Sequence, residues 1–495
     1  MELFPLFVAV PLGVAFLAAL VPKRAARVAD VLGNLGSLAL VALVVLFYGR
    51  TGAVHVGGWA PPVGIVLVLD PLSWFILATV SAVTLAVTIY SIRYMDRYTG
   101  RGKYYALFFL MVTGMMGVVA TGDLFNLYVF LEIASIASYA LVAFGCESEE
   151  LEASFRYAVL GSVASCFILF GIALLYSVFG TVNMAHLAAK IAALGGVTGS
   201  TTLTAGLVFF LAGFGLKAAL VPFHAWLPDA HPSAPAPISA MLSGVLIKAI
   251  GVYALARIVF NVIGLTTTTS YVLMAMGTLS MLFGVLLAVI QWDFKRLLAY
   301  HSISQIGYVV LAIGLGTPLG IMGGLFHLLN HALFKSLLFL NAGAVEYSTG
   351  TRDLQKMGGL RNRLPVTANT SMVASMSIAG IPPFNGFFSK LIIIVACIEA
   401  HQWLFAALAV VVSIVTLASF IKVQKYVFMG SLGEKWKSLR EVPVFMCAAM
   451  VLLALACLAT AALVVPPVRD AVLRPAADVL AAGAEKVGMV LGGVK

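Results

Sequence analysis

The sequence predicts an all-α polytopic membrane protein. Of its 495 residues, 62% are hydrophobic and only 10% are charged, whereas a soluble domain has roughly 25% charged residues. Apolar runs of about 20 residues recur along the whole chain, and each is long enough to cross the hydrocarbon core as a helix. A membrane barrel would show short alternating segments instead, so we expect the backbone to satisfy its hydrogen bonds within helices.

We expect about fourteen transmembrane helices of this length. Their predicted boundaries are 3–21, 28–48, 70–92, 104–121, 124–145, 157–179, 203–226, 236–259, 271–291, 296–315, 319–345, 366–398, 403–428 and 442–464. The seventh and twelfth spans contain internal prolines, which predicts that each is broken into two half-helices. Residues 467–491 resemble a short amphipathic tail. A cleavable signal peptide begins with basic residues, but this chain has Glu2 there. The first helix is therefore expected to stay in the protein and not to be cleaved off.

The loop charges predict the orientation of the helices. Nearly all the loop lysines and arginines fall in the odd-numbered loops: Lys23, Arg24, Arg27, Arg93, Arg97, Arg101, Lys103, Arg156, Lys295, Arg296, Arg352, Lys356, Arg361, Arg363, Lys435, Lys437 and Arg440. The even-numbered loops carry only Arg50, Lys190 and Arg257. By the positive-inside rule the odd loops are cytoplasmic, which places both termini on the outer side of the cell inner (plasma) membrane. The formal net charge of +10 therefore reflects topology and not a nucleic-acid partner.

The spacing of the interrupted spans predicts an internal repeat. Three N-terminal helices (1–102) precede one five-helix block (103–260) and then a second (271–428), and 429–495 hold the fourteenth helix and the tail. The proline-interrupted span is fourth in each block. Because each block has an odd number of spans, the second enters the membrane from the opposite side. Inverted repeats with interrupted helices at matching positions indicate a transport site near the midplane.

Ionisable side chains at bilayer depth are the strongest functional signal, because they are costly there and usually face a bundle interior or a water-filled path. They are Glu132 in the fifth span, Lys217 before Pro222 in the seventh, Lys248 in the eighth, His327, His331 and Lys335 in the eleventh, and Lys390 after Pro382 and Pro383 in the twelfth. A snorkelling lysine or a histidine bonded to a carbonyl would explain any one of them. However, these ionisable residues occur at helix centres or interruptions in five different spans, and that explanation does not account for all of them together.

The predicted chemistry is proton transfer. Burial lowers the pKa of a lysine and a nearby carboxylate raises it again, so Glu132 approaching or leaving Lys217 would change how tightly the lysine holds its proton. Lys248 would connect this pair to the second half of a polar axis across the bundle. His224 and Asp229, in the turn that follows the first break, are the candidate proton entrance.

Neither a metal site nor a cofactor is expected. The i, i+4 spacing of His327 and His331 would permit a metal, but no carboxylate or cysteine accompanies them. A proton relay is the better interpretation of this pair. The five cysteines have no CxxC spacing, and no dinucleotide, Walker or haem motif is present.

Several motifs resemble the antiporter-like family. They are LFNLYVFLEIASIASYALVAF, KAALVPFHAWLPDAHPSAPAPISAMLSG, DFKRLLAYHSISQIGY, HLLNHALFKSLLFL and GIPPFNGFFSK. This family includes the D-type subunit of Mrp cation/proton antiporters, the proton-pumping membrane subunits of complex I and their counterparts in membrane-bound hydrogenases. The resemblance covers essentially the whole chain and implies fourteen helices in inverted five-helix repeats.

The resemblance also implies roles for individual residues. Glu132 matches the family's fifth-helix glutamate, and Lys217 its seventh-helix lysine. Lys248 matches the bridging lysine, the eleventh-helix relay corresponds to His327, His331 and Lys335, and Lys390 corresponds to the terminal proton carrier. Lysine at that last position favours the D-type branch over complex I subunits that have glutamate there. The chain lacks the long C-terminal extension of the largest members, which makes the A-type subunit a poor match.

We therefore expect an ion-translocating subunit of an Mrp-type Na⁺(cation)/H⁺ antiporter, with other membrane subunits, protons, Na⁺ and lipids as partners. A subunit of a redox-driven pump, such as complex I, a hydrogenase or formate hydrogenlyase, is the main alternative. An oxidoreductase subunit that handles electrons itself is disfavoured by the lack of ligand motifs. A purely structural subunit would not be expected to keep costly buried charges, and no dedicated pocket predicts a free-standing solute transporter.

Overall fold

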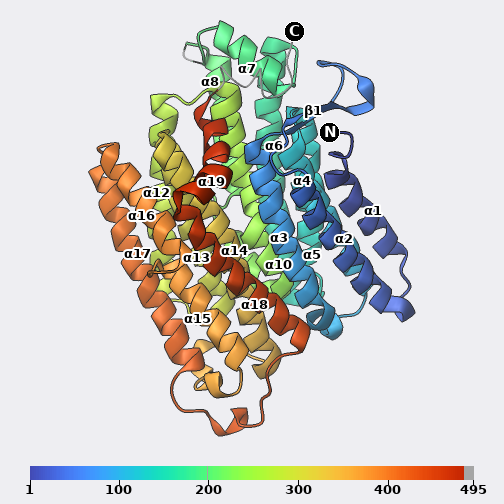
Figure 1. Ribbon diagram of the computed structural model, residues 1–495, viewed down its shortest axis with the longest axis vertical. Helices are drawn as coiled ribbons and strands as arrows, with labels where there is room; N and C mark the ends of the chain where they lie inside the picture. Colours follow the sequence, from blue (N-terminus) through green and yellow to red (C-terminus); the bar gives the residue numbers. More distant parts are fainter. Residues whose placement is uncertain (198, 484–495) are drawn as a thin grey trace.

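The chain folds into a bundle of long helices that lie roughly parallel (Figure 1). The computed structural model describes residues 1–197 and 199–483. Within these residues, 11 helices are long and apolar enough to cross a membrane. They correspond to all the predicted spans except the first, the seventh and the twelfth. The first is α1 (Leu6–Leu20), which has 15 residues, and the other two are interrupted.

The N-terminal part contains α1, α2 (Ala26–Leu46) and α3 (Pro71–Tyr94). A hairpin of β1 (Gly52–His55) and β2 (Val66–Leu69), which the sequence did not predict, joins α2 to α3 with Gly52 opposite Leu69. Helix α3 begins with a capping box, in which the Asp70 carboxylate accepts the Ser73 N–H and the Ser73 hydroxyl accepts the Asp70 N–H.

The predicted first block (103–260) continues the bundle. Its elements are α4 (Arg101–Ala120), α5 (Leu124–Val142), α6 (Ser148–Phe179), α7 (Met184–Ala193), α8 (Thr201–Lys217), α9 (Leu227–Ser233) and a continuous helix formed by α10 (Ala236–Met241), η4 (Leu242–Tyr253), α11 (Ala254–Ala256) and η5 (Arg257–Ile263). Segments η4 and η5 are π-helical. Helix α7 was not predicted; it lies beyond the ends of the long helices (Figure 1).

The second block and the C-terminal part complete the structure. Their elements are α12 (Thr267–Val289), α13 (Phe294–Gly314), α14 (Pro318–Thr349), α15 (Pro365–Ala379), α16 (Asn385–Glu399), α17 (Trp403–Val423) with its π-helical end η8 (Gln424–Phe428), α18 (Val444–Ala459) with η10 (Thr460–Val464), and α19 (Pro466–Ala481). The predicted tail is α19, which packs against α3 and α14. Its predicted part from 484 to 491 lies outside the described residues.

Side-chain caps explain where many of these helices begin. In these cases an Asp, Asn, Ser or Thr immediately before the helix accepts a hydrogen bond from an N–H of the first turn. The capping residues are Asp123 for α5, Asn183 for α7, Ser200 for α8, Thr266 for α12, Asp293 for α13 and Thr317 for α14. Such a cap satisfies one of the N–H groups that a helix start leaves without a partner.

The two interruptions occupy the fourth span of each block, as the prolines predict. Helix α8 ends at Lys217, and the chain is non-helical until α9, with Ala219 at a φ of +55°. In the second block, α15 ends before Gly380 at a φ of +79°, and α16 begins at Asn385. The peptide bonds that precede Pro222 and Pro383 are cis.

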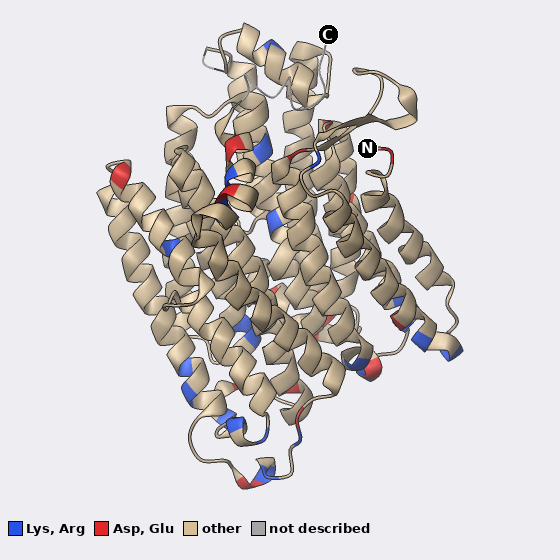
Figure 2. Ribbon diagram, viewed as in Figure 1, with Lys and Arg blue, Asp and Glu red and all other residues tan. Residues whose placement is uncertain are grey.

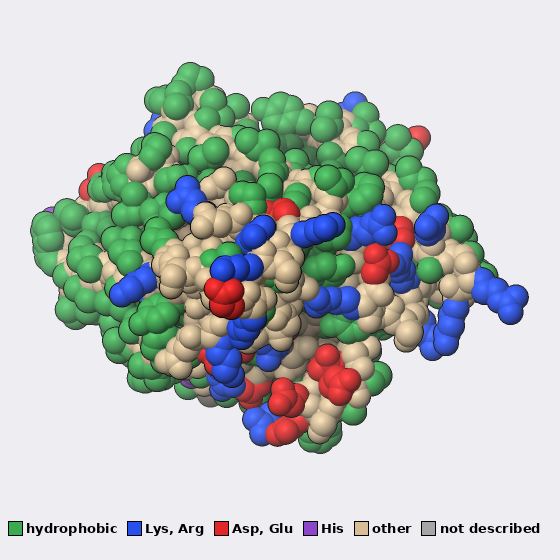
Figure 3. All heavy atoms as spheres, turned by 90° about the horizontal axis from the view of Figure 1, so that it is seen from below, with side chains coloured by type: hydrophobic (Ala, Val, Ile, Leu, Met, Phe, Trp, Pro, Cys, Tyr) green, Lys and Arg blue, Asp and Glu red, His purple; other side chains and the backbone are tan. Residues whose placement is uncertain are grey.

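Several basic residues that the sequence placed in loops lie within helices, among them Arg257, Lys295 and Arg156. Arg257 is buried in the eighth span because that helix extends to Ile263 instead of ending at 259. Lys295 is buried in the first turn of α13. Helix α6 begins at Ser148 rather than 157, so Arg156 is helical. The remaining lysines and arginines still gather strongly at one end of the bundle, opposite α7 and the hairpin (Figures 2 and 3).

Candidate functional site

The centre of the first block holds a lysine and a glutamate that face each other. Lys217 Nζ lies 3.6 Å from Glu132 Oε1. The same ammonium donates to Ser135 Oγ at 2.9 Å and to Tyr139 Oη at 3.4 Å. Ser165 on α6 donates a further hydrogen bond to Glu132. The lysine is buried, whereas 25% of the glutamate side chain is exposed, so the carboxylate has a route to the surface of this subunit.

The non-helical segment after Lys217 is held by side chains from its neighbours. The Val221 N–H donates to Ser280 Oγ of α12 at 2.9 Å, and Trp226 Nε1 donates to the Leu216 carbonyl at 3.0 Å. The Trp226 ring also stacks on Tyr157, with centroids 4.1 Å apart. These contacts satisfy backbone groups that the interrupted helix leaves open, which is a condition for irregular backbone inside a membrane.

Lys248 lies on η4, the π-helical part of the eighth span. This segment contacts α8 of the first block and α14 of the second. A Cβ on Gly251 would meet Ala218, next to Lys217, at 2.7 Å. A Cβ on Gly244 would meet Ser336 Oγ, next to Lys335, at 2.0 Å. These two close approaches place Lys248 between the lysines of α8 and α14. Its ammonium is buried and donates to the Ser243 carbonyl.

Helix α14 carries a buried row of titratable groups. His327 Nδ1 lies 2.9 Å from Ser389 Oγ and its Nε2 lies 3.2 Å from Gln305 Oε1. The ring of His331 follows at a centroid distance of 6.4 Å. Both ring nitrogens of His331 and the Lys335 ammonium have no hydrogen-bond partner among the described residues. Buried polar groups without a partner are rare and indicate either function or bound water.

Lys390 ends the row on the far side of the second interruption. It lies in the second turn of α16, and its ammonium donates to the Ile378 carbonyl at 2.8 Å and to Ser413 Oγ at 3.3 Å. The ammonium also lies 5.0 Å from the centre of the Tyr308 ring. The Ile378 carbonyl belongs to the last turn of α15, so the broken helix itself supplies an acceptor for this lysine.

An asparagine pair joins the second interruption to α14. Asn385 donates to Asn330 Oδ1 at 3.0 Å and to Thr460 Oγ1 at 2.9 Å, and Asn330 donates back to the Asn385 carbonyl. Since Asn330 lies between His327 and His331 in the sequence of α14, this network fixes the position of the histidine row relative to Lys390.

The two residues predicted at a proton entrance lie apart from this row. Asp229 on α9 pairs with Arg156 at 3.0 Å and with Arg296 at 3.3 Å. It lines a cavity of about 290 Å³ at the basic end of the bundle, together with acidic and basic residues of α6 and α13. His224 is half-buried in the first interruption, and its Nδ1 has no partner among the described residues.

The structure adds buried polar groups that the sequence analysis did not single out. His231 and His301 are fully buried, and neither ring has a hydrogen-bond partner in the described part of the chain. The His231 ring lies 4.6 Å from Phe339, one helical turn after Lys335. Lys295 pairs with Glu346 at 3.0 Å and donates to the Ala234 carbonyl at 3.1 Å. The sequence could have pointed to His231 and His301, since both lie within the motifs that resemble the antiporter-like family.

No group of three or more His, Cys, Asp or Glu side chains within 1–197 and 199–483 could hold a metal ion. His327 and His331 accordingly face hydroxyl, amide and aromatic groups. The arrangement as a whole is a set of buried lysine and histidine nitrogens and one carboxylate, contributed by α5, α8, η4, α14 and α16.

Residues 121–416 match the family described as "NADH:quinone oxidoreductase/Mrp antiporter, TM". The chain belongs to this family. A second match, to the "NADH-Ubiquinone oxidoreductase (complex I), chain 5 N-terminus", covers residues 57–105. The region that identifies this antiporter-like family therefore includes every residue of the candidate site.

Relatives in this family include subunits of NADH-quinone oxidoreductases and of Na⁺/H⁺ antiporters. The chain is 40% identical over 440 residues to the N-type subunit of an NADH-quinone oxidoreductase from Desulforudis audaxviator, with 87% of each chain covered. It is 39% identical over 381 residues to the D-type subunit of a Na⁺/H⁺ antiporter from Alkalihalophilus pseudofirmus, with 76% of each covered. A chain in the "Structure of Mrp complex from Dietzia sp. DQ12-45-1b" superposes with a TM-score of 0.90, 31% identity and 99% of both chains covered.

Proposed function

We propose that this antiporter-like chain moves protons through the membrane as one subunit of a multisubunit complex. The observation that carries the proposal is the Lys217–Glu132 pair, 3.6 Å apart, at the end of a helix that stops at bilayer depth. An ion pair in this position is costly to bury and gains little stability for the fold. Its retention is explained if the pair changes state during ion transport.

The proton path follows the line of titratable groups. While Glu132 stays beside Lys217, the carboxylate favours the charged lysine. When Glu132 turns toward its exposed side, that support is lost and the lysine releases its proton into the interrupted segment. Lys248 accepts it, because Gly251 brings the eighth span against Ala218. From Lys248 the proton passes to Lys335, whose helix is in contact at Gly244.

The second half of the path leads along α14 to Lys390. His331 and His327 lie on the same face as Lys335, and water between them would complete the hydrogen bonds that the described residues leave open. In this proposal the two five-span blocks, 103–260 and 271–428, are two half-channels joined at Lys248. The cavity at Asp229 opens toward the solvent at the basic end and serves as the entrance, with His224 or the buried His231 receiving the proton.

Within this function, we propose the D-type subunit of an Mrp Na⁺(cation)/H⁺ antiporter. The structural similarity to a chain of an Mrp complex and the lysine at position 390 support it. A membrane subunit of a redox-driven complex is the second candidate, and the relative named as the N-type subunit of an NADH-quinone oxidoreductase supports that alternative. In both cases the partners are the other membrane subunits of the complex.

We further propose that the chain lies in the cell plasma membrane with its basic end in the cytoplasm. The gathering of lysine and arginine at one end (Figure 2) supports this orientation under the positive-inside rule. The N-terminus lies toward the opposite end of the bundle (Figure 1) and would therefore face outward. With fourteen spans, an even number, the C-terminus would face the same side.

Two experiments test the proposal. The variants Lys217→Ala and Glu132→Ala should abolish proton translocation by the purified complex in proteoliposomes, while the amount of assembled complex stays unchanged. Full transport in either variant would disprove the role of the pair. Purifying the native complex and identifying its chains by mass spectrometry separates the two kinds of partner. Small Mrp-like subunits would establish an antiporter, and iron–sulfur, nickel or flavin subunits would establish a redox pump.

A further inference from the structure

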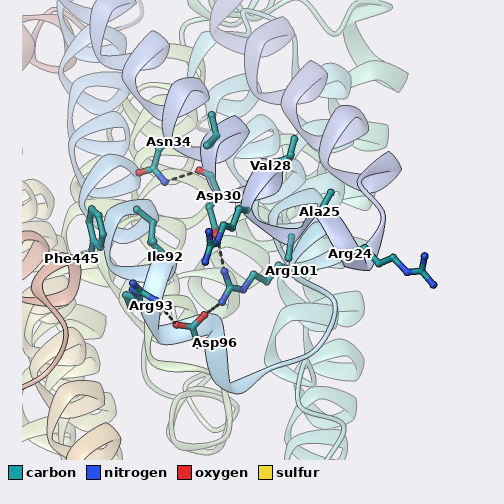
Figure 4. A pocket seen from close by; sticks show the side chains of 13 residues that line it. Arg24, Ala25, Val28, Asp30, Asn34, Ile92, Arg93, Asp96, Arg101 and Phe445 are labelled. Atoms are coloured by element: carbon teal, nitrogen blue, oxygen red, sulfur yellow. Dashed lines mark hydrogen bonds and ion pairs between the residues drawn. The ribbon is translucent and has the colours of Figure 1, made fainter.

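A cavity of about 940 Å³ opens at the basic end of the bundle, and its lining residues are not part of the candidate site. Its walls come from the start of α2, the end of α3, the start of α4 and the first turn of α18 (Figure 4). Ile92 of α3 and Phe445 of α18 form its apolar side, and Asn34 of α2, which donates to the Asp30 carbonyl, lies above them in this view.

The charged side of the cavity is a cluster of arginines with incomplete compensation. Four arginines line it (Arg24, Arg27, Arg93 and Arg101), but only two carboxylates do (Asp30 and Asp96). Arg101 lies 2.7 Å from Asp30 and also pairs with Asp96, which in turn lies 3.5 Å from Arg93. Arg24 and Arg27 are exposed and have no carboxylate partner in the described part of the chain. The cavity therefore keeps an excess of positive charge.

An apolar face of α3 between α2 and α18, here called the apolar groove, continues from this charged cavity along the helix. Helix α3 packs against α2 on one side and α18 on the other. Between them α3 presents a stripe of partly exposed apolar residues at helical spacing: Ala78, Ala82, Leu85, Ile89 and Ile92. The edges of the groove are also apolar and exposed, with Val31 and Leu35 on α2 and Phe445 and Leu452 on α18. A ligand that fits both parts has an anionic head and a hydrocarbon tail.

We propose that this site binds a phospholipid with an anionic headgroup, of the phosphatidylglycerol or cardiolipin class, from the cytoplasmic leaflet. The phosphate lies among Arg27, Arg93 and Arg101, which donate to its oxygens in the forked geometry that suits phosphate. Arg24, whose side chain extends outward in Figure 4, adds positive charge at the rim of the cavity. One acyl chain lies on the α3 stripe between α2 and α18. Basic pockets between transmembrane helices at the cytoplasmic side are the usual setting for such headgroups. The bound lipid fills the gap between the N-terminal helices and α18, and so ties the two ends of the chain together.

The test uses the full-length chain in detergent, titrated with phosphatidylglycerol and read by native mass spectrometry. The variant Arg24→Gln/Arg27→Gln should bind the first lipid on the order of thirtyfold more weakly, since each arginine near an anionic lipid contributes about 1 kcal/mol. The matched control is Arg361→Gln/Arg363→Gln, which removes two exposed arginines from the same basic end without touching the groove. That control should bind as the unmodified chain does.

Two further arms separate the lipid from other occupants. Ala82→Trp fills the groove but keeps all four arginines, and should also weaken lipid binding. Inorganic phosphate at millimolar concentration should fail to displace the lipid, because the acyl chain holds it. Equal lipid binding by the double arginine variant, unchanged binding by Ala82→Trp, or displacement by phosphate alone would each overturn the proposal. So would a map of the intact complex with a neighbouring subunit's helix in the groove.

Discussion

Lys217 and Glu132 meet at 3.6 Å where the seventh span leaves its helical path. The lysine comes from the last residue of α8 and the glutamate from the middle of α5. Ser135, one turn from Glu132, offers the ammonium a second acceptor at 2.9 Å. The lysine can therefore keep a hydrogen bond when the glutamate moves, which is what a pair that changes state requires.

The charge of Glu132, and not its shape, is predicted to be essential. Glu132→Gln keeps the length of the side chain and an acceptor for Ser165, but removes the carboxylate that faces Lys217. We expect proton transport by the reconstituted complex to fall to background. Ser165→Ala keeps the charge and removes only the hydroxyl that bonds Glu132 and the Gly161 carbonyl, so it should reduce transport partially. Equal loss in the two variants would contradict an electrostatic role.

Lys248 is predicted to be the connection between the two half-channels. Lys248→Met has similar volume but binds no proton, so transport across the whole path should stop even though both blocks remain folded. Lys190→Met, on α7 outside the long helices, is the matched control and should transport normally. The measurement is proton uptake into proteoliposomes under an imposed gradient. Substantial uptake in the Lys248→Met variant would show that the halves are joined elsewhere.

The spans and the two interruptions could be predicted from sequence, because a membrane helix and a proline each impose a strong local constraint. The ends of helices could not. Arg257 was placed in a loop because a charged residue near the end of an apolar run usually lies outside the membrane, in water. In the structure Asp70, 187 residues earlier, neutralises its charge inside the bundle. A pairing between residues so far apart leaves no local pattern.

The buried histidines show a second limit. His327 and His331 were found because their spacing on one helix is visible in the sequence. His231 lies beside Phe339 of α14 only through the tertiary packing of α9, which contacts mainly α13 and α6, and His301 lies beside Phe420 of α17 through packing of α13. The π-helical form of the eighth span was also not predicted, because no local sequence pattern in it distinguishes a π-helix from an α-helix.

The contact at Gly251 is predicted to limit what the eighth span tolerates. In Gly251→Ala the new Cβ would lie 2.7 Å from Ala218 Cα, so the backbone of the interrupted segment must shift. Such overpacking costs about 1–3 kcal/mol, and the thermal unfolding midpoint in detergent should fall. Gly13→Ala on α1, where a Cβ meets nothing within 4 Å, should leave the midpoint unchanged or raise it. A Gly251→Ala protein as stable as the parent would show that the two elements are not tightly packed.

The Asp70–Arg257 pair is predicted to be structural. Arg257 donates to both Asp70 oxygens, at 2.6 and 2.5 Å, and also contacts Asn261 and Tyr253. Arg257→Met leaves a buried carboxylate without its partner, which costs about 3–5 kcal/mol. The unfolding midpoint should fall sharply, and Asp70→Leu in the same chain should restore part of it. As a control, Arg50→Met replaces an exposed arginine in the loop between α2 and β1 and should leave the midpoint unchanged. An unchanged midpoint in Arg257→Met would rule out this structural role.

The orientation of the bundle gives a prediction that depends on none of the buried groups. Cys146 is exposed in the loop between α5 and α6, which the charge distribution places in the cytoplasm. In a Cys166→Ser background, a membrane-impermeant maleimide should label Cys146 in inside-out vesicles and not in intact cells. Thr51→Cys, in the exposed segment before β1, should show the reverse in a chain that also carries Cys146→Ser. Labelling of Cys146 from outside the cell would invert the topology, and with it the side from which protons enter at Asp229.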